Sequence, residues 1–342
     1  MNKHYNNGLE TAQGSMLRAL AFIFCLNITT LSVNAQSYAG ITNIPDTTYS
    51  LYSAYTGTKK TNPEIKIVGE MHSADVNEKK NITYCSIGNR KLLLDAFYQS
   101  EKNKKISPAI IIIHGGGWRS GNRTMHYPLA QKLAELGYVC FTPEYRLSTE
   151  ALFPAAIYDI KEAIRWVKKN AGVYNIDTTK IVVAGFSAGG EMAAFIGVTG
   201  KIPLFEGLNS NTNETTSVNA IIDIDGTLSF VHSESGEGDD SKRPSAGTYW
   251  FGYSKKDNPE IWRIASPLTW AGKNTPATLF LNSAVDRMHA GRSDYIKILN
   301  EHNIYSEVHT FEGAPHSFCL FDPWFDPMVK YIDEFLKKVF NK

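Results

Sequence analysis

The most regular feature of the chain is an alternation of short apolar runs with longer helical repeats between residues 109 and 340. The apolar runs are rich in β-branched residues, which predicts buried parallel strands. Between them, apolar residues recur every three or four positions, which predicts amphipathic helices. Strands are expected at 109–113, 138–143, 181–183, 218–224, 278–281 and 307–311, and helices at 125–136, 155–169, 191–196, 293–300 and 327–340. This alternation indicates an α/β fold with a mostly parallel sheet.

The segment before residue 109 has a different pattern, with short strands and turn signals but no helical repeat. Two antiparallel strands joined at Gly88-Asn89 and two edge strands are expected there. Their ranges are 82–87 and 91–97 for the antiparallel pair, and 49–55 and 64–68 for the edge strands. Residues 227–272 show no clear period. We therefore expect one domain, 36–342, with a cap-like insertion at 227–272.

The N-terminus has the three parts of a secretory signal peptide. Arg18 supplies positive charge, residues 19–26 form a short apolar core, and Val33-Asn34-Ala35 is a small-residue cleavage site. The apolar run is too short and too interrupted for a membrane span. We expect residues 1–35 to be removed near Ala35-Gln36, with a secreted or periplasmic mature chain and no membrane span in it.

Composition narrows the class of protein. The 342 residues are 43% hydrophobic and 20% charged, with a net charge of +1, so no basic surplus points to nucleic acid. The four cysteines form no C-x-x-C pair, and no H-E-x-x-H is present. No cofactor and no metal are expected.

The stretch around Ser187 carries the first chemical motif. A buried strand runs into Gly185-Phe-Ser-Ala-Gly189, and a helix-compatible segment follows. This is G-x-S-x-G in the strand–turn–helix context that presents a nucleophilic serine. Glycines at both ends avoid a clash where strand and helix approach. A small-residue turn that only packs a helix on the sheet is the alternative.

A second motif, His114-Gly-Gly-Gly-Trp118, also follows a buried strand. Backbone N–H groups of Gly116, Gly117 and Trp118, together with that of Ala188, can converge on a tetrahedral oxyanion. The lysine and Ser/Thr of a phosphate-binding loop are missing. His114 itself is expected to hold the loop rather than act as a base.

The base should follow the last strand, as His316 does. The acid that orients it is expected to be Asp286, which gives the chain order Ser, Asp, His. Two alternatives remain: Asp225, after the preceding strand, and Asp294, at the start of the next helix, where it could simply be a cap.

These motifs together resemble the α/β-hydrolase superfamily, from about residue 92 to 340. The HGGGW loop, the GFSAGG turn, Pro143-Glu-Tyr-Arg-Leu147 and the tail 305–318 are similar to its hormone-sensitive-lipase-like and carbohydrate esterase branch. The resemblance implies a three-layer sandwich with helices on both faces of the sheet and an ester substrate on a polysaccharide or oligosaccharide. Residues 222–226 and 289–292 resemble pectin methylesterases, so a pectin methyl or acetyl ester is favoured, with acetyl-xylan or feruloyl esterase as the alternative. A general carboxylesterase or lipase, an exopeptidase and a non-catalytic binding module rank lower.

Specificity is expected to arise in the insertion and at arginines near loop ends. Six aromatic residues between 249 and 270 either stack on sugar rings or form a small hydrophobic cap. Arginines near loop ends can pair with a uronate carboxylate, although surface ion pairs explain them equally. The expected substrate contacts are Arg119, Trp250, Arg287, His289 and Arg292.

Overall fold

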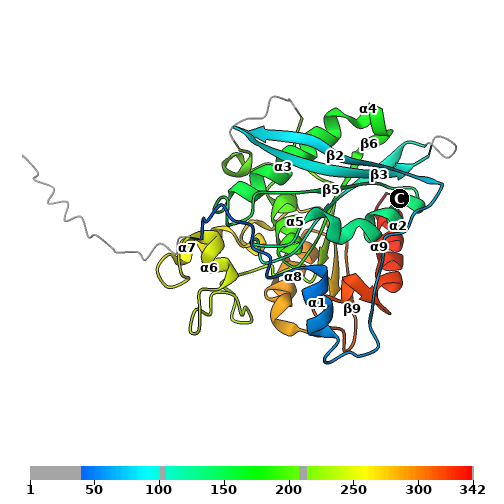
Figure 1. The fold of residues 1–342 in the computed structure, drawn as a ribbon. Coiled ribbons are helices and arrows are strands. Elements are labelled where there is room, and N and C mark those ends of the chain that lie inside the picture. The colour runs from blue at the N-terminus through cyan, green and yellow to red at the C-terminus, as the bar shows by residue number, and fades with distance from the viewer. Residues whose placement is uncertain (1–39, 101–104, 208–213, 341–342) are drawn as a thin grey trace, which may run out of the picture. The chain divides into compact units, whose positions relative to one another are not determined.

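The centre of the fold is an eight-stranded sheet in the order β2-β3-β5-β4-β6-β7-β8-β9. The chain is described by a computed structural model that covers residues 40–100, 105–207 and 214–340. β3 is antiparallel to both of its neighbours, and the strands from β5 to β9 are parallel (Figure 1). The strands are β2 (Val76–Ile87), β3 (Arg90–Gln99), β4 (Ser107–Ile113), β5 (Val139–Pro143), β6 (Ile176–Phe186), β7 (Ala220–Ile224), β8 (Ala277–Asn282) and β9 (Ser306–Thr310).

Helices cover both faces of this sheet, so the predicted three-layer sandwich with a mostly parallel sheet is confirmed (Figure 1). One buried apolar cluster packs α3, α5 and α8 against one face, and a second packs α2 and α9 against the other. The helices are α1 (Leu51–Thr58), α2 (Tyr127–Glu135), α3 (Ala155–Lys169), α4 (Ala171–Tyr174), α5 (Ala188–Val198), α6 (Ala246–Phe251), α7 (Pro259–Ile264), α8 (Arg292–Glu301) and α9 (Phe325–Phe340). All described residues belong to one unit, Gln36–Lys342.

The register of the sheet brings three strand ends to the same edge. Phe186 of β6 lies opposite Ile224 of β7, and Ile224 lies opposite Leu281 of β8. The residues that follow, Ser187 and Asp225, therefore emerge side by side. The Ser187 amide donates to the Ile224 carbonyl at 2.8 Å, and the Asp225 amide donates to the Leu281 carbonyl at 2.9 Å.

The insertion at 227–272 forms α6, α7 and the 3₁₀ turn η4 (Pro267–Trp270). Its large aromatic side chains face inward: Trp250 and Trp262 have no exposed surface. They pack with Phe230 and Phe251 at ring-centroid distances of 4.5 to 6.5 Å. These four rings therefore form a hydrophobic cap and are not exposed for stacking on sugar rings.

One predicted strand is wrong. Residues 51–55 of the predicted strand belong to the helix α1, and Ser50 is its N-cap. The Ser50 hydroxyl accepts from the Ser53 amide at 3.1 Å, and the Ser53 hydroxyl accepts from the Ser50 amide at 2.8 Å. This reciprocal cap satisfies the backbone amides of Ser50 and Ser53 and so stabilises the start of a helix. The predicted edge strand 64–68 shrinks to β1 (Lys66–Ile67), paired with β10 (Phe321–Asp322). The predicted signal peptide lies outside the described residues.

Candidate active site

Ser187 lies at a sharp turn between β6 and α5. Its backbone has φ 56° and ψ −120°, a strained conformation for a residue with a side chain. Gly185 makes this turn possible, because a Cβ there would lie 2.0 Å from the Gly189 carbonyl oxygen. The strand therefore enters the helix tightly and leaves the serine side chain at the carboxyl edge of the sheet, as the motif predicts.

His316 reaches this serine from the loop after β9. Its Nε2 lies 2.8 Å from the Ser187 hydroxyl oxygen, and its ring packs against Phe186 at 4.9 Å between centroids. The side chain is 26% exposed, so the imidazole remains accessible from the cleft. The structure thus brings together the two residues that sequence reasoning selected as nucleophile and base.

The carboxylate that contacts His316 is Asp225 and not Asp286. Asp225 Oδ2 lies 2.6 Å from His316 Nδ1. Asp286 is exposed in the 3₁₀ turn η5 (Asp286–His289), several residues beyond the end of β8. Asp294 is also exposed, in the first turn of α8, with its carboxylate 3.7 Å from His232. The prediction of Asp286 is therefore corrected to the alternative, Asp225, which directly follows β7 and so lies next to Ser187.

Four hydrogen bonds hold the Asp225 carboxylate, which is fully buried. Besides His316, the donors are the Ser283 amide at 2.8 Å, the Ser283 hydroxyl at 2.6 Å and His289 Nε2 at 3.0 Å. Burial alone would raise the pKa of Asp225, but the hydrogen bonds from both histidines and from Ser283, with the charge of His316, lower it to about 2. An ionised carboxylate fixes the tautomer of His316, so that Nδ1–H donates to Asp225 and the lone pair of Nε2 faces the Ser187 hydroxyl.

The glycine loop after β4 lies against the serine. A Cβ on Gly115 would lie 3.1 Å from the Ser187 Cβ, and Gly116 has φ 124°, which a side chain would strain. The Gly116 carbonyl accepts from the Ser120 amide and hydroxyl at 3.0 and 2.9 Å. Within the described part of the chain, no acceptor faces the backbone amides of the predicted oxyanion residues, which are Gly116, Gly117, Trp118 and Ala188. Of these residues, Gly116 and Gly117 line the cleft beside Ser187, so their amides can reach a ligand there.

The side chain of Trp118 anchors this loop from behind. Its indole N–H donates to Glu191 Oε2 at 3.0 Å, and its ring stacks on Trp250 at 4.7 Å. Burial raises the pKa of Glu191 well above its ordinary value. Trp250 is fully buried in this stack, so the structure contradicts its predicted contact with substrate.

His114 holds the start of the loop, as predicted. Its Nδ1 lies 2.8 Å from the Gly115 carbonyl oxygen, and its ring stacks on Tyr145 at 4.4 Å. The imidazole is buried, and burial lowers its pKa to about 4. A neutral, enclosed imidazole of this kind is a structural support and not a base for Ser187.

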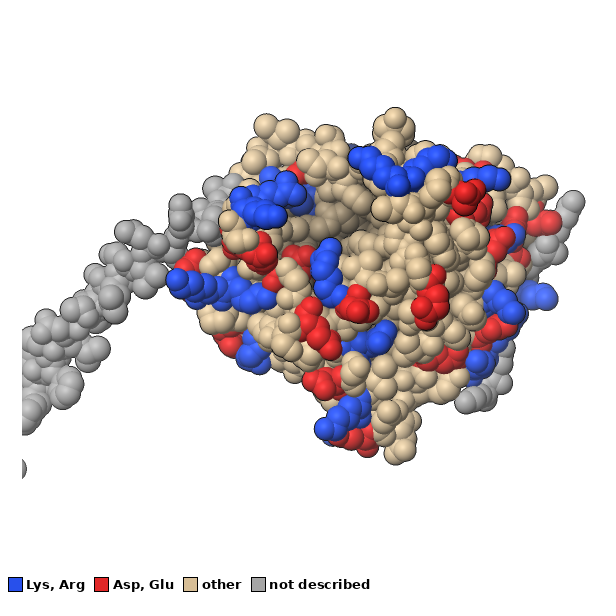
Figure 2. All heavy atoms as spheres, turned by 90° about the horizontal axis from the view of Figure 1, so that it is seen from below, with Lys and Arg blue, Asp and Glu red and all other residues tan. Residues whose placement is uncertain are grey.

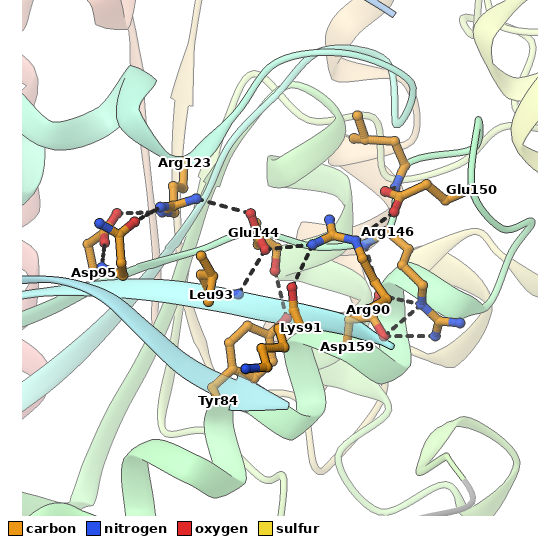
Figure 3. Close-up of polar contacts among 12 residues, drawn as sticks. Tyr84, Arg90, Lys91, Leu93, Asp95, Arg123, Glu144, Arg146, Glu150 and Asp159 are labelled. Carbon is orange, nitrogen blue, oxygen red and sulfur yellow. Dashed lines mark hydrogen bonds and ion pairs between the residues drawn. The ribbon is translucent and has the colours of Figure 1, made fainter. Parts of the chain in front are cut away.

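A network of ion pairs holds the far end of the loop (Figure 3). Arg123, five residues past Trp118, donates to Asp95 at 2.5 Å and to Glu144 at 3.0 Å. Glu144 also accepts from Arg90 at 2.9 Å. Asp95 on β3 is fully buried. The loop is therefore tied to the antiparallel hairpin at the edge of the sheet.

An open cleft of about 850 Å³ contains Ser187 and His316. Arg119 and Arg287 line it, as their predicted role requires. His289 and Arg292 do not, and the structure contradicts their predicted contact with substrate. His289 hydrogen-bonds Asp225, and Arg292 donates to the side-chain oxygen of Asn282.

Sequence reasoning missed two residues that support this site. Ser283 directly follows β8, and its hydroxyl donates to Asp225, the carboxylate that contacts His316. Glu191 is a charged residue inside the apolar stretch 181–196. Its position among buried residues indicates that its carboxyl needs a hydrogen-bond donor, which is the Trp118 indole. Lys242 and Arg243, which also line the cleft, lie in an insertion with no periodic pattern to mark them.

One group among the described residues has the donors to hold a metal ion: Glu70, His72 and Glu78. Lys80 lies 3.4 Å from the first and 3.2 Å from the third of these side chains. The group is separate from the cleft residues. No described helix has the length and apolar character needed to cross a membrane.

Several known proteins with similar sequences are named esterases. Esterase LipC of Mycobacterium tuberculosis is 29% identical over 244 residues, which are 67% of this chain and 58% of that protein. Esterase LipQ of the same organism is 29% identical over 204 residues, 59% of this chain and 47% of that protein. The chain thus spans about half the length of these curated relatives.

Two solved structures with the same fold are described as esterases. A truncated carbohydrate esterase from gut microbiota has a TM-score of 0.65 at 24% identity, covering 79% of this chain and all of that one, 100%. Esterase Est2 of Thermogutta terrifontis has a TM-score of 0.62 at 23% identity, covering 78% and 95%. The α/β-hydrolase fold is confirmed. The BD-FAE family model matches residues 94–292, more than half of the 342-residue chain, and the chain therefore belongs to the BD-FAE family.

Proposed function

We propose that this protein is a serine esterase with a Ser187–His316–Asp225 triad. The observation that carries the proposal is the continuous hydrogen-bonded chain from the Ser187 hydroxyl through His316 to Asp225, at 2.8 and 2.6 Å. Beside it lie backbone amides for which the described residues provide no acceptor. A nucleophile, a base, an orienting carboxylate and oxyanion donors in one cleft are what acyl transfer requires.

The mechanism follows from the positions of these groups. Nε2 of His316 takes the Ser187 proton while the serine oxygen attacks the ester carbonyl, and Asp225 stabilises the imidazolium. The oxyanion is bound by the amides of Ala188 and of the Gly116–Trp118 turn. Each such donor contributes roughly 3–4 kcal/mol to lowering the barrier. His316 then protonates the leaving alcohol, and water, activated by the same imidazole, hydrolyses the acyl-enzyme.

The proposed substrate is an ester substituent on plant polysaccharide, with a pectin methyl or acetyl ester favoured over acetyl-xylan or feruloyl esters. The fold shared with a gut carbohydrate esterase supports a glycan ester. An exported chain, cleaved near Ala35-Gln36, would meet such substrates outside the cytoplasm. N-terminal sequencing of the protein purified from its producing cells tests export, and a retained residue 1 would contradict it.

The decisive test of the proposed activity is turnover of p-nitrophenyl acetate by the wild type and by Ser187→Ala. We expect the wild type to hydrolyse the ester and the variant to lose about 10³-fold or more in kcat. Equal rates for the two proteins would refute the triad. Product analysis on acetylated xylan, methylated pectin and arabinoxylan then separates acetate, methanol and ferulate release, and acetate as the only product would rule out methyl ester hydrolysis.

A further inference from the structure

The cleft that contains Ser187 carries an excess of basic side chains. Four basic residues and two acidic ones line it, namely Arg119, Lys242, Arg243 and Arg287 against Asp46 and Asp239. Figure 2 shows a face of the molecule that is hollowed, with Lys and Arg side chains at the rim of the hollow. The net charge of the whole chain is only +1, so this concentration is local.

Arg119 already has partners and contributes little free charge. Its Nε lies 2.9 Å from Asp46, its Nη1 donates to the Gly40 carbonyl at 3.1 Å, and its guanidinium covers the Tyr249 ring at 4.3 Å. The positive charge of Arg119 is thus balanced by the negative charge of Asp46. It forms a fixed wall of the cleft.

The other three basic residues make no ion pair within 4.0 Å with any residue that the structure describes: Lys242, Arg243 and Arg287. All three are exposed. Asp239 is solvent-exposed too, and its carboxylate accepts from the Ser241 amide at 3.1 Å. Glu237 interacts electrostatically with Arg287, but its side chain does not line the cleft. Positive charge therefore prevails in the cleft beside the Ser187 hydroxyl.

The remaining lining does not suit a long apolar acyl chain. Its apolar members are Tyr49, Pro244, Ala246 and Tyr249, and the rest are glycines, hydroxyl residues, the charged residues and His316. Deep lipid-binding slots are lined mainly by apolar side chains. An open, polar and basic cleft selects a hydrated, negatively charged substrate, because it concentrates anions and because arginine binds carboxylates through two parallel hydrogen bonds.

We propose that the cleft binds an oligosaccharide ester that carries free carboxylates beside the scissile bond, with Arg243 and Arg287 as the carboxylate-binding residues. This inference rests on the proposed esterase function and specifies its substrate. The substrate is a glycan with uronate residues, some of whose carboxylates are unesterified, and it is preferred to a neutral glycan with the same ester group. The small polar lining fits a methyl or acetyl substituent on such a chain.

The test compares two substrates that release the same product. Acetylated oligogalacturonide is anionic and acetylated xylo-oligosaccharide is neutral, and acetate release is measured for both. We expect the wild type to prefer the anionic substrate in kcat/KM and to lose this preference as salt rises from 20 to 300 mM. Arg243→Gln and Arg287→Gln should each lower the anionic-to-neutral ratio about tenfold, mainly through KM. Lys273→Gln, an exposed change outside the cleft, is the matched control and should leave the ratio unchanged.

A binding measurement separates this inference from the esterase proposal. Calorimetric titration of Ser187→Ala with trigalacturonate should show binding that weakens about tenfold in the additional Arg243→Gln change. Binding without wild-type turnover of p-nitrophenyl acetate would support the anionic cleft and refute the esterase. Turnover with no substrate preference, or a preference that both arginine variants retain, would overturn the anionic cleft and leave the esterase standing.

Discussion

Replacing His289 by Phe tests how Asp225, the proposed triad acid, is held. His289 Nε2 lies 3.0 Å from Asp225 Oδ1, on the side of the carboxylate opposite His316. The imidazole is 9% exposed, so phenylalanine fills a similar volume without offering a donor. Oδ1 then keeps only the Ser283 amide at 2.8 Å, and the carboxylate that orients His316 is less firmly fixed.

The magnitude follows from the pKa of Asp225. Its pKa is lowered from 3.8 to about 2 in the folded state, and this shift corresponds to about 2.5 kcal/mol of stability at neutral pH. Because the folded pKa lies below the unfolded one, this stabilisation is present above about pH 4 and is lost as pH falls towards 2. His289 is one of three side chains that lower the pKa, so its removal should cost about 1 kcal/mol of unfolding free energy. A lost hydrogen bond to a charged group of about 1.5 kcal/mol predicts a fall in kcat/KM of about tenfold.

The assay is kcat/KM on p-nitrophenyl acetate between pH 4 and 9, together with urea unfolding at pH 7. His289→Phe should lose activity over the whole range, because Asp225 stays ionised throughout it and the loss comes from the weaker orientation of His316. His289→Gln, which restores an N–H donor, should recover most of the activity. His302→Gln, an exposed change at the end of α8, is the control. Wild-type kcat/KM and stability in His289→Phe would refute this role.

Three further changes probe the supports of the site. Trp118→Phe keeps the ring but removes the donor to the buried Glu191, so urea unfolding should show a loss of about 1–3 kcal/mol, and no loss would contradict the role of this hydrogen bond. Arg123→Met leaves the fully buried Asp95 without its cation and should cost about 3–5 kcal/mol by the same measurement, against less than 1 kcal/mol expected for breaking an exposed pair. Burial lowers the pKa of His126 to about 3 in the folded protein. Between about pH 6.5 and 3 the unfolded chain therefore binds more protons than the folded one, and the unfolding free energy should fall by up to about 1.4 kcal/mol for each unit by which the pH is lowered. His126→Gln should flatten that dependence, and an unchanged slope would contradict a buried neutral imidazole.

The parts of the site that follow directly on a strand could be predicted from sequence. Ser187 and the glycine loop each directly follow a buried apolar strand whose end is visible in the sequence. Because these strands are parallel neighbours, their ends lie together at one edge of the sheet. His316 lies on a short loop after the last strand. In these cases the local pattern determines the position, because a few residues separate the side chain from a rigid element.

The acid could not be selected in the same way. Asp225 and Asp286 each follow a predicted strand, and only the register across β6, β7 and β8 shows which one lies near His316. That register depends on pairing between distant residues. The insertion was ambiguous for a related reason: Trp250 has the composition of a sugar-binding residue, but its burial depends on Trp118, which is remote in sequence.

In the proposed mechanism, Asp225 completes a triad with His316 and Ser187. The most direct measurement is kcat/KM on p-nitrophenyl acetate for Asp225→Asn and Asp286→Asn, with folding checked by circular dichroism. We predict a fall of about 10³ to 10⁴-fold for Asp225→Asn and a value within about twofold of the wild type for Asp286→Asn. Full activity in Asp225→Asn, with activity lost in Asp286→Asn, would show that Asp225 is not the acid of the triad.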